Sequence, residues 1–161
     1  PTAEVTEGEI WYNTSSDTFK SVVAGEAWSS SSPIISPAGY LGSAGTQTAG
    51  LVFAMGNGPN TSFSAATYEY NGSGWSSGGV MSTAKSLTAA GGTQTAAYAA
   101  AGQTGSSTYT NNTEEYGGTS WTAGGNYPGP MRGPAGTGPQ TAAIAFGGSP
   151  GGSGDTNATN Y

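Results

Sequence analysis

The stretch GTQTAGLVFAMG at positions 45–56 recurs as GTQTAAYAAAG at 92–102 and as GPQTAAIAFG at 138–147. A catalytic site is usually assembled once from unlike parts, whereas a stretch that recurs at a fixed spacing is typical of a repeat architecture. The three copies therefore indicate that the chain is built by repetition of one structural unit.

Each unit carries one tryptophan and one glutamine at fixed positions. The tryptophans are 47 and 46 residues apart, and each glutamine follows its tryptophan by 19 residues. The predicted repeat core consists of Trp28, Trp75, Trp121, Gln47, Gln94 and Gln140. Recurring tryptophans could also form a platform for sugar rings, but their tendency to be buried favours a place in the core.

The residues after each glutamine alternate between two apolar faces. In the first copy Leu51 and Phe53 form a bulky face, while Val52 and Ala54 form a small one. A period of two residues with both faces apolar predicts a β-strand buried between neighbouring sheets. The sequence shows no convincing helix, so the predicted fold class is all-β.

Two more strands per unit are predicted around a turn that contains glycine. The stretches TYEYNGSGW at 67–75 and TEEYGGTSW at 113–121 end one strand at tyrosine and open the next at tryptophan. Asn71-Gly72 and Gly117-Gly118 are dipeptides that suit a two-residue hairpin turn, because they tolerate positive φ.

Polar connections follow the buried strand of each unit, at 57–66, 103–112 and 149–158. They keep their length while their sequence drifts, which is typical of loops, and loops on a regular scaffold commonly carry recognition. The aromatic residues of the variable segments are therefore the candidate ligand-binding residues. They are Phe63, Tyr109 and Tyr127.

The order of these features resembles kelch-type repeats. The unit that starts at Tyr116 shows the order complete, with Trp121, Arg132, the strand AAIAF and Gly147-Gly148. The resemblance implies kelch-like β-propeller blades with a repeat of about 46–47 residues. The predicted repeats span 28–66, 67–112 and 113–158, and another copy starts at 159–161.

The number of repeats is small for a propeller, which usually closes with four to eight blades. We therefore expect a partial propeller or an open β-repeat array, completed by further chain or by neighbouring subunits. Because the sequence opens on Pro1 and carries no signal peptide, we expect these 161 residues to be a processed or partial piece of a longer product.

The first 27 residues differ from the repeats and form a predicted N-terminal module, 1–27. Residues 9–12 are expected to pair with 18–22 as a β-hairpin. The module resembles a short element of bacteriophage tail and fibre proteins. The matching residues are Gly8, Ile10, Trp11, Tyr12, Asn13, Phe19 and Lys20. Together with the repeats, this module resembles predicted phage tail-fibre or virion appendage proteins, which implies an extracellular, virion location.

Composition disfavours several classes of partner. The net charge is −6, and the cations are only Lys20, Lys85 and Arg132, so the chain is poorly equipped to neutralise a phosphate backbone and no nucleic-acid partner is expected. The longest apolar runs are far too short to span a bilayer, so no membrane insertion is expected. The chain also lacks cysteine and histidine, which removes thiol nucleophiles, imidazole bases and the usual zinc ligands.

The remaining motifs do not predict chemistry. Glu114 and Glu115 are neighbours on a predicted strand and so point to opposite faces, unlike the two carboxylates of a glycosidase. GGSPG at 147–151 matches a nucleophile elbow, but the chain has no histidine to act as its base. One carboxylate, Asp155, is poor equipment for calcium. We expect no catalytic residue, no metal site, no cofactor, and no enzymatic activity.

Candidate glycosylation sites follow the Asn-x-Ser/Thr pattern. They are Asn13, Asn60, Asn71, Asn112 and Asn157. The resulting expectation is a non-enzymatic structural and adhesive component of an extracellular particle, a phage tail fibre or virion appendage whose loops face host-surface glycans. Its partners would be copies of itself, other virion or filament proteins, and host carbohydrate. The alternative is a microbial extracellular filament or cell-surface protein that assembles by β-strand pairing and carries glycans.

Overall fold

The computed structural model describes residues 10–13, 18–21, 30–57, 62–151 and 154–161, and the chain divides into two units, Pro1–Ser31 and Ser32–Tyr161. The first unit contains an antiparallel hairpin in which β1 (Ile10–Asn13) pairs with β2 (Thr18–Ser21). Predicted core residue Trp28 lies outside the described residues.

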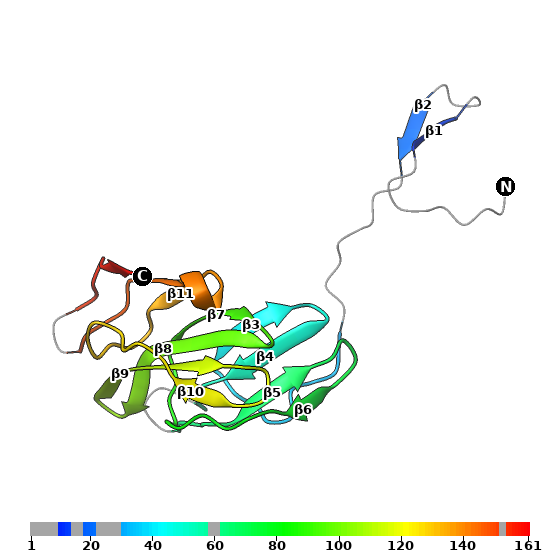
Figure 1. The fold of residues 1–161 in the computed structure, drawn as a ribbon. Helices are drawn as coiled ribbons and strands as arrows, with labels where there is room; N and C mark the ends of the chain where they lie inside the picture. Colours follow the sequence, from blue (N-terminus) through cyan, green and yellow to red (C-terminus); the bar gives the residue numbers. More distant parts are fainter. Residues whose placement is uncertain (1–9, 14–17, 22–29, 58–61, 152–153) are drawn as a thin grey trace. The chain divides into compact units, whose positions relative to one another are not determined.

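The second unit consists of three antiparallel sheets (Figure 1). The first sheet has the order β3 (Gly42–Thr46), β4 (Ala49–Phe53), β5 (Thr67–Tyr70) and β6 (Trp75–Ser77). The second runs through β7 (Ala89–Thr93), β8 (Ala96–Gly105), β9 (Thr108–Tyr116) and β10 (Trp121–Ala123). The third contains β11 (Ala135–Thr137), β12 (Ile144–Phe146) and β13 (Thr159–Asn160), with one short 3-10 turn, η1 (Gln140–Ala142). The all-β prediction is confirmed.

The strands nearest one another in neighbouring sheets are β3, β7 and β11, which lie side by side. Their close approach depends on glycine. A Cβ atom on Gly136 would lie 2.7 Å from the backbone nitrogen of Ala90, and one on Gly91 would lie 2.9 Å from the carbonyl oxygen of Gly138. Both contacts are too short for a side chain to fit, so these strands must be built from very small residues. They were not predicted from the sequence.

The sheets keep the predicted period but not the predicted repeat boundaries. Each sheet begins with its innermost strand before the glutamine, and the first two sheets end with the strand that opens on tryptophan. The predicted boundary at 66/67 therefore falls between two paired strands, β4 and β5. The pairing of Phe146 with Thr159 also places Thr159 at the repeat position of Thr67, which pairs with Phe53. Threonine therefore occupies the same position in each of the three sheets, with a spacing of 46 residues between Thr67, Thr113 and Thr159.

The core lies where neighbouring sheets face each other. Leu51 and Phe53 are 1% and 0% exposed, and with Tyr116 they form the cluster between the first two sheets. The predicted bulky face of the third copy is different, because Ile144 and Phe146 are each 42% exposed. These two side chains lie at the repeat positions of Leu51 and Phe53, where no further sheet packs against them among the described residues.

Two predicted connections have a different structure. Residues 103–112, predicted as a loop, lie largely within the long β8–β9 hairpin, whose pairing shifts between Ala100 and Gly102 and again before Gly105. The turns that follow Tyr70 and Tyr116 span four residues instead of two, because Tyr70 pairs directly with Trp75 and Tyr116 with Trp121. The Asn71 side chain explains the first turn, since its Oδ1 accepts hydrogen bonds from the backbone N–H groups two and three residues on.

Candidate functional site

The recurring glutamines join neighbouring sheets. The Gln94 side-chain amide donates to the carbonyl oxygens of Gly50 and Tyr70 at 3.0 and 2.8 Å. Gln140 repeats this arrangement one sheet later, donating to the carbonyls of Ala97 and Tyr116 at 2.8 and 3.0 Å. The glutamine thus caps two backbone acceptors that belong to the preceding sheet, which explains its fixed place in each unit.

The first member of the series, Gln47, has no such sheet before it. Its side chain is exposed and makes no hydrogen bond to another residue that the structure describes. The same residue type at the same repeat position therefore has two environments, one at a junction and one at an open face.

Because Gln94 is bonded at a junction and Gln47 is exposed, the same substitution at the two positions should have different effects on stability. Replacing Gln94 with leucine is expected to lower the free energy of unfolding by about 1–3 kcal/mol, because two half-buried carbonyls lose their donor. The Gln47→Leu variant is the control and should change stability by less than about 0.5 kcal/mol, as surface substitutions usually do. Urea unfolding in dilute solution measures both. Equal losses in the two variants would contradict the role of the glutamine at the junction.

The tryptophans also make hydrogen bonds, and one of them does so across a junction between sheets. The Trp121 indole N–H donates to Oγ1 of Thr67 at 2.8 Å, and its ring meets Phe53 edge-on at a centroid distance of 4.8 Å. Trp75 packs on Tyr70 at 5.0 Å and donates to the carbonyl of Ser32 at 3.1 Å. Both rings are half-buried. The two tryptophans that the structure describes in the repeats are therefore tied into the scaffold.

A tyrosine and a glutamate make a further link between the first two sheets. The Tyr116 hydroxyl donates to Oε1 of Glu69 at 2.5 Å and accepts from the backbone N–H of Gly79. Burial, and after it the bond to Glu69, raises the pKa of Tyr116. Glu115, at the repeat position of Glu69, instead lines a cavity of about 520 Å³ between the second and third sheets, beside Tyr127 and Gln140.

The segments between the second and third strands of the first and third sheets, and the outer part of the β8–β9 hairpin in the second sheet, are held in place by backbone hydrogen bonds. We call the described residues of 54–66, 101–113 and 147–158, together with 85–87 and 131–133, the loop face. Two reciprocal pairs of backbone hydrogen bonds tie it to the start of a sheet, Ser86 with Gln103 and Arg132 with Ser149, at 2.8–3.0 Å. Gly39 and Gly56 make the same pair in the first sheet.

A second backbone ladder crosses the sheets at this end. The N–H of Leu87 donates to the carbonyl of Tyr40 at 2.9 Å, and the N–H of Gly133 donates to the carbonyl of Leu87 at 2.7 Å. All three residues have positive φ, at 49° for Tyr40, 52° for Leu87 and 65° for Gly133. Left-handed backbone is costly for a residue with a side chain, so its recurrence shows that the ladder imposes this conformation.

Tyr109 and Arg132 meet on the loop face. The Arg132 guanidinium lies 5.8 Å from the centroid of the Tyr109 ring, and a Cβ on Gly151 would lie only 2.4 Å from that ring. Tyr109 therefore packs between its own hairpin and the 149–158 connection. Beside it is a depression of about 370 Å³. Its lining consists of Leu87, Arg132, Gly133, Gly148, Ser149 and Asp155.

The other two aromatic candidates lie in different places. Phe63 is half-buried in the first connection, next to the bridge between Ser64 and Lys85. Tyr127 is 6% exposed and belongs to the apolar cluster between the second and third sheets, where its hydroxyl accepts from the Asn160 side chain at 2.8 Å. The structure thus brings Tyr109 next to a polar depression, and it places Tyr127 in the apolar cluster, on the wall of the cavity between the second and third sheets.

Sequence reasoning missed the buried charge pair under the loop face. Lys85 is 0% exposed; its ammonium lies 3.8 Å from Oε1 of Glu114 and donates to the carbonyls of Ala99 and Asn112 at 3.0 Å. The Glu114 carboxylate also accepts from the backbone N–H groups of residues 82 and 83. The pair thus anchors residues 82–85, which precede the first strand of the second sheet, to β8 and β9. The available signal was that Lys85 is one of only three cations in an acidic, charge-poor chain.

The buried lysine makes stability depend on pH. Burial lowers the pKa of Lys85 from 10.5 to about 8, against the opposing attraction of Glu114. Between these values the unfolded chain binds a proton that the folded chain has lost, so stability rises with pH. We expect a gain of about 2 kcal/mol between about pH 7 and about pH 9.5. Above about pH 10 the raised pKa values of Tyr98 and Tyr116 act in the opposite direction.

Urea unfolding at a series of pH values measures this curve. The expected form is a maximum on the alkaline side of neutrality. Lys85→Met is the control and should abolish the rise. A stability that stays level or falls from pH 7 to about pH 9.5 would contradict the assigned environment of Lys85.

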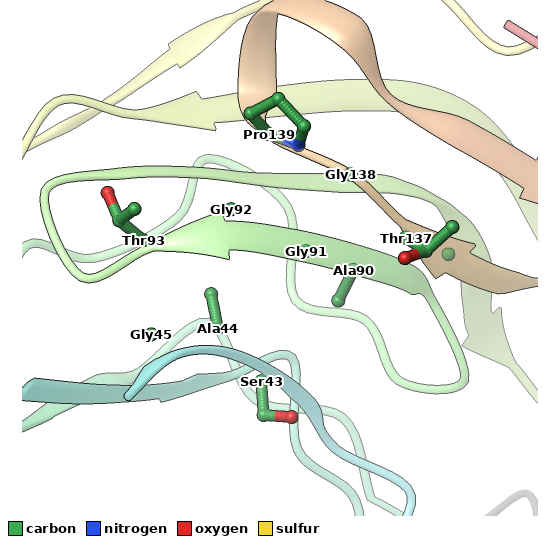
Figure 2. A pocket seen from close by; sticks show the side chains of 11 residues that line it. Ser43, Ala44, Gly45, Ala90, Gly91, Gly92, Thr93, Thr137, Gly138 and Pro139 are labelled. Atoms are coloured by element: carbon green, nitrogen blue, oxygen red, sulfur yellow. The ribbon is translucent and has the colours of Figure 1, made fainter. Parts of the chain in front are cut away.

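The innermost strands form a groove of about 600 Å³ (Figure 2). Its walls come from β3, β7 and the end of β11, and they consist of glycine, alanine, serine, threonine and proline residues. No ionisable side chain lines this groove. Among the residues that the structure describes, no group of three His, Cys, Asp or Glu side chains is placed to hold a metal ion.

The candidate glycosylation sites fall in several environments. Asn71, Asn112 and Asn157 are exposed, Asn71 in a turn and Asn112 on β9. Asn60 and the side chain of Asn13 lie outside what the structure describes. In the described part of the chain, no helix has the length and apolar character needed to cross a bilayer.

Comparison with known proteins supports the architecture. No protein-family model matches the chain, and no curated protein matches it. Among solved structures, YjhT, a kelch-repeat protein, superposes with a TM-score of 0.65 at 10% sequence identity. The match covers 93% of this chain and 47% of the YjhT chain, so the chain spans about half the length of that protein. The three sheets are therefore kelch-like blades of a partial propeller, and at this identity the similarity shows the fold alone.

Proposed function

We propose that the chain is a non-enzymatic structural and adhesive component of an extracellular particle, a phage tail fibre or virion appendage, that presents its loop face to host-surface glycans. The observation that carries the proposal is the polar depression beside Tyr109, with Arg132, Ser149 and Asp155 on its wall. Guanidinium, hydroxyl and carboxylate groups suit the hydroxyl groups of a sugar.

Arg132, on the wall of the depression, is tied to its surroundings. Arg132 is fixed through its backbone pair with Ser149 and through the Tyr109 ring under its guanidinium. A side chain that is already held in place loses less conformational entropy when a ligand binds, which favours recognition by a small polar site. The kelch-like sheets would then act as the scaffold, and the connections as the recognition surface.

The link to a virion rests on the N-terminal module. The residues around β1 and β2 carry the resemblance to phage tail proteins, with Trp11 opposite Lys20 and Tyr12 opposite Phe19 in the hairpin. A module of this kind that precedes a repeat domain in the sequence is consistent with a particle that exposes the repeats on its surface.

A glycan array with the 161-residue chain tests the adhesive role. We expect selective glycan binding that falls at least tenfold in Arg132→Ala and less in Arg132→Lys, which keeps the charge but loses the planar fork of donors. Thr122→Ala, exposed on β10, is the matched control and should bind normally. Absence of binding, or binding unchanged by Arg132→Ala, would overturn the role of the loop face.

Particle membership needs a separate measurement. Peptides of this chain should be found by mass spectrometry in virions purified from a lysate of a host that carries the gene. Their presence only in the cell-surface or secreted fraction would reject the virion assignment.

A further inference from the structure

The junction between the first and second sheets has two chemically different sides. The second sheet contributes donors, with Gln94 bonding two carbonyls and Trp121 bonding Thr67. The first sheet contributes carbonyls, the Thr67 hydroxyl and the Phe53 ring. We call these the donor face and the acceptor face of a sheet. The junction between the second and third sheets repeats the glutamine bonds, so the faces are a property of the repeat.

The third sheet has an open acceptor face. Ile144 and Phe146 are each 42% exposed, whereas their repeat equivalents Leu51 and Phe53 are 1% and 0% exposed. Ala143 stands at the repeat position of Ala97, whose carbonyl accepts from Gln140. The side chains of this face are thus those of a junction, exposed to solvent.

Among the described residues, the donor face of the first sheet is open apart from Trp75, whose indole N–H donates to the carbonyl of Ser32. Leu41 is 39% exposed, although Thr88 at the same repeat position is 8% exposed. Tyr40, which begins the backbone ladder, is 45% exposed, and Gln47 makes no bond to another described residue. In the part of the chain that the structure describes, one donor face and one acceptor face therefore have no neighbouring sheet.

We propose that a second copy of this chain occupies these faces, so that the donor face of each copy docks on the acceptor face of the other and two copies close a ring. Gln47 of one copy then donates to the carbonyl of Ala143 in the other. The N–H of Tyr40 donates to the carbonyl of Gly133, which extends the ladder that runs through Leu87.

Two observations favour a second copy as the occupant. The donor face and the acceptor face belong to the same repeat, and the internal junctions show how two such faces pair. The chain also covers 47% of the single kelch-repeat chain to which it is similar in fold, so two copies together have about the extent of that protein. Both faces would contribute to a closed assembly with two equivalent interfaces. This inference does not depend on glycan binding.

The mass of the purified 161-residue chain in solution tests the proposal. Light scattering coupled to size-exclusion chromatography should give twice 15.8 kDa, with dissociation to 15.8 kDa on dilution. A mass of 15.8 kDa at every concentration would overturn the proposal. A mass that keeps growing with concentration would overturn the closed ring, because it indicates an open head-to-tail chain.

Substitutions on the donor face and on the acceptor face test whether these are the surfaces that form the dimer. Gln47→Glu replaces the donor with a carboxylate that repels the carbonyls, and Phe146→Ser removes an exposed apolar ring from the opposite face. Each is expected to weaken the dimer at least tenfold. Ser107→Glu, in the exposed turn of the β8–β9 hairpin, adds the same charge as Gln47→Glu and should leave the mass unchanged. A dimer that resists both face variants uses another surface, which would overturn the assignment.

Discussion

Replacing Lys85 with methionine is expected to lower the free energy of unfolding by about 2–4 kcal/mol at about pH 9.5, where the amine is neutral in the folded chain. The substitution keeps most of the side-chain volume but removes the donor that the carbonyls of Ala99 and Asn112 share. Near pH 7 the loss should be about 2 kcal/mol smaller, because the charged ammonium then carries the cost of its burial. Each buried carbonyl that is left without a donor carries the cost of an unmade hydrogen bond.

A double variant separates the charge from the packing. Lys85→Met with Glu114→Gln should recover at least about 1 kcal/mol relative to Lys85→Met alone, because the neutral amide oxygen still accepts from the N–H groups of residues 82 and 83. Arg132→Met removes a half-buried cation and is the control, with an expected loss below about 1 kcal/mol. Urea unfolding followed by circular dichroism measures all variants. If Lys85→Met lowered the free energy of unfolding no more than Arg132→Met, the buried pair of Lys85 and Glu114 would not stabilise the fold.

The strands that could be predicted from the sequence are those whose apolar residues alternate between two faces. The residues after Gln47 and Gln94 alternate cleanly, and β4 and β8 begin two residues after each glutamine. The innermost strands escaped prediction because GSAGT, AAGGT and AGT contain only small residues, so neither face stands out. Their strand character comes from pairing with β4, β8 and β12 and from the close approach of neighbouring sheets.

Burial at junctions could not be predicted from one copy of the repeat. Gln47 and Gln94 have the same local sequence, GTQTA, yet one is exposed and the other is bonded to the preceding sheet. The difference lies in the presence of a neighbouring sheet, which is a property of tertiary structure. For the same reason the sequence could not separate Tyr109, beside the depression, from Tyr127, which packs in the core.

Lys85 shows a further limit of sequence reasoning. Lysine is almost never fully buried unless it is paired, so a lysine before a strand is expected at the surface. Its burial here follows from a partner, Glu114, that lies 29 residues further along the chain. The chemistry of both residues was visible in the sequence, but their proximity depends on how β9 packs in the second sheet.

Replacing Phe53 with alanine is expected to lower the free energy of unfolding by about 3–5 kcal/mol, the usual cost of removing a large buried ring. Phe53 is 0% exposed and meets Trp121 edge-on at 66°, and a Cβ on Gly42 would lie 2.6 Å from its ring. The surrounding strands are too tightly built to collapse into the space that the ring leaves. The variant should therefore retain a cavity at the first junction, and it should weaken the contact through which Trp121 holds the second sheet.

The repeat supplies its own control for this experiment. Phe146 occupies the position of Phe53 in the third sheet but is 42% exposed, so in dilute solution Phe146→Ala should cost less than about 1 kcal/mol. Tryptophan fluorescence during urea unfolding reports both, because Trp121 contacts the Phe53 ring directly. Similar losses in the two variants would mean that the third sheet is covered even in the isolated chain. A large loss confined to Phe53→Ala would locate the stabilising contact at the junction between sheets, since the residue type and the repeat position are the same in both.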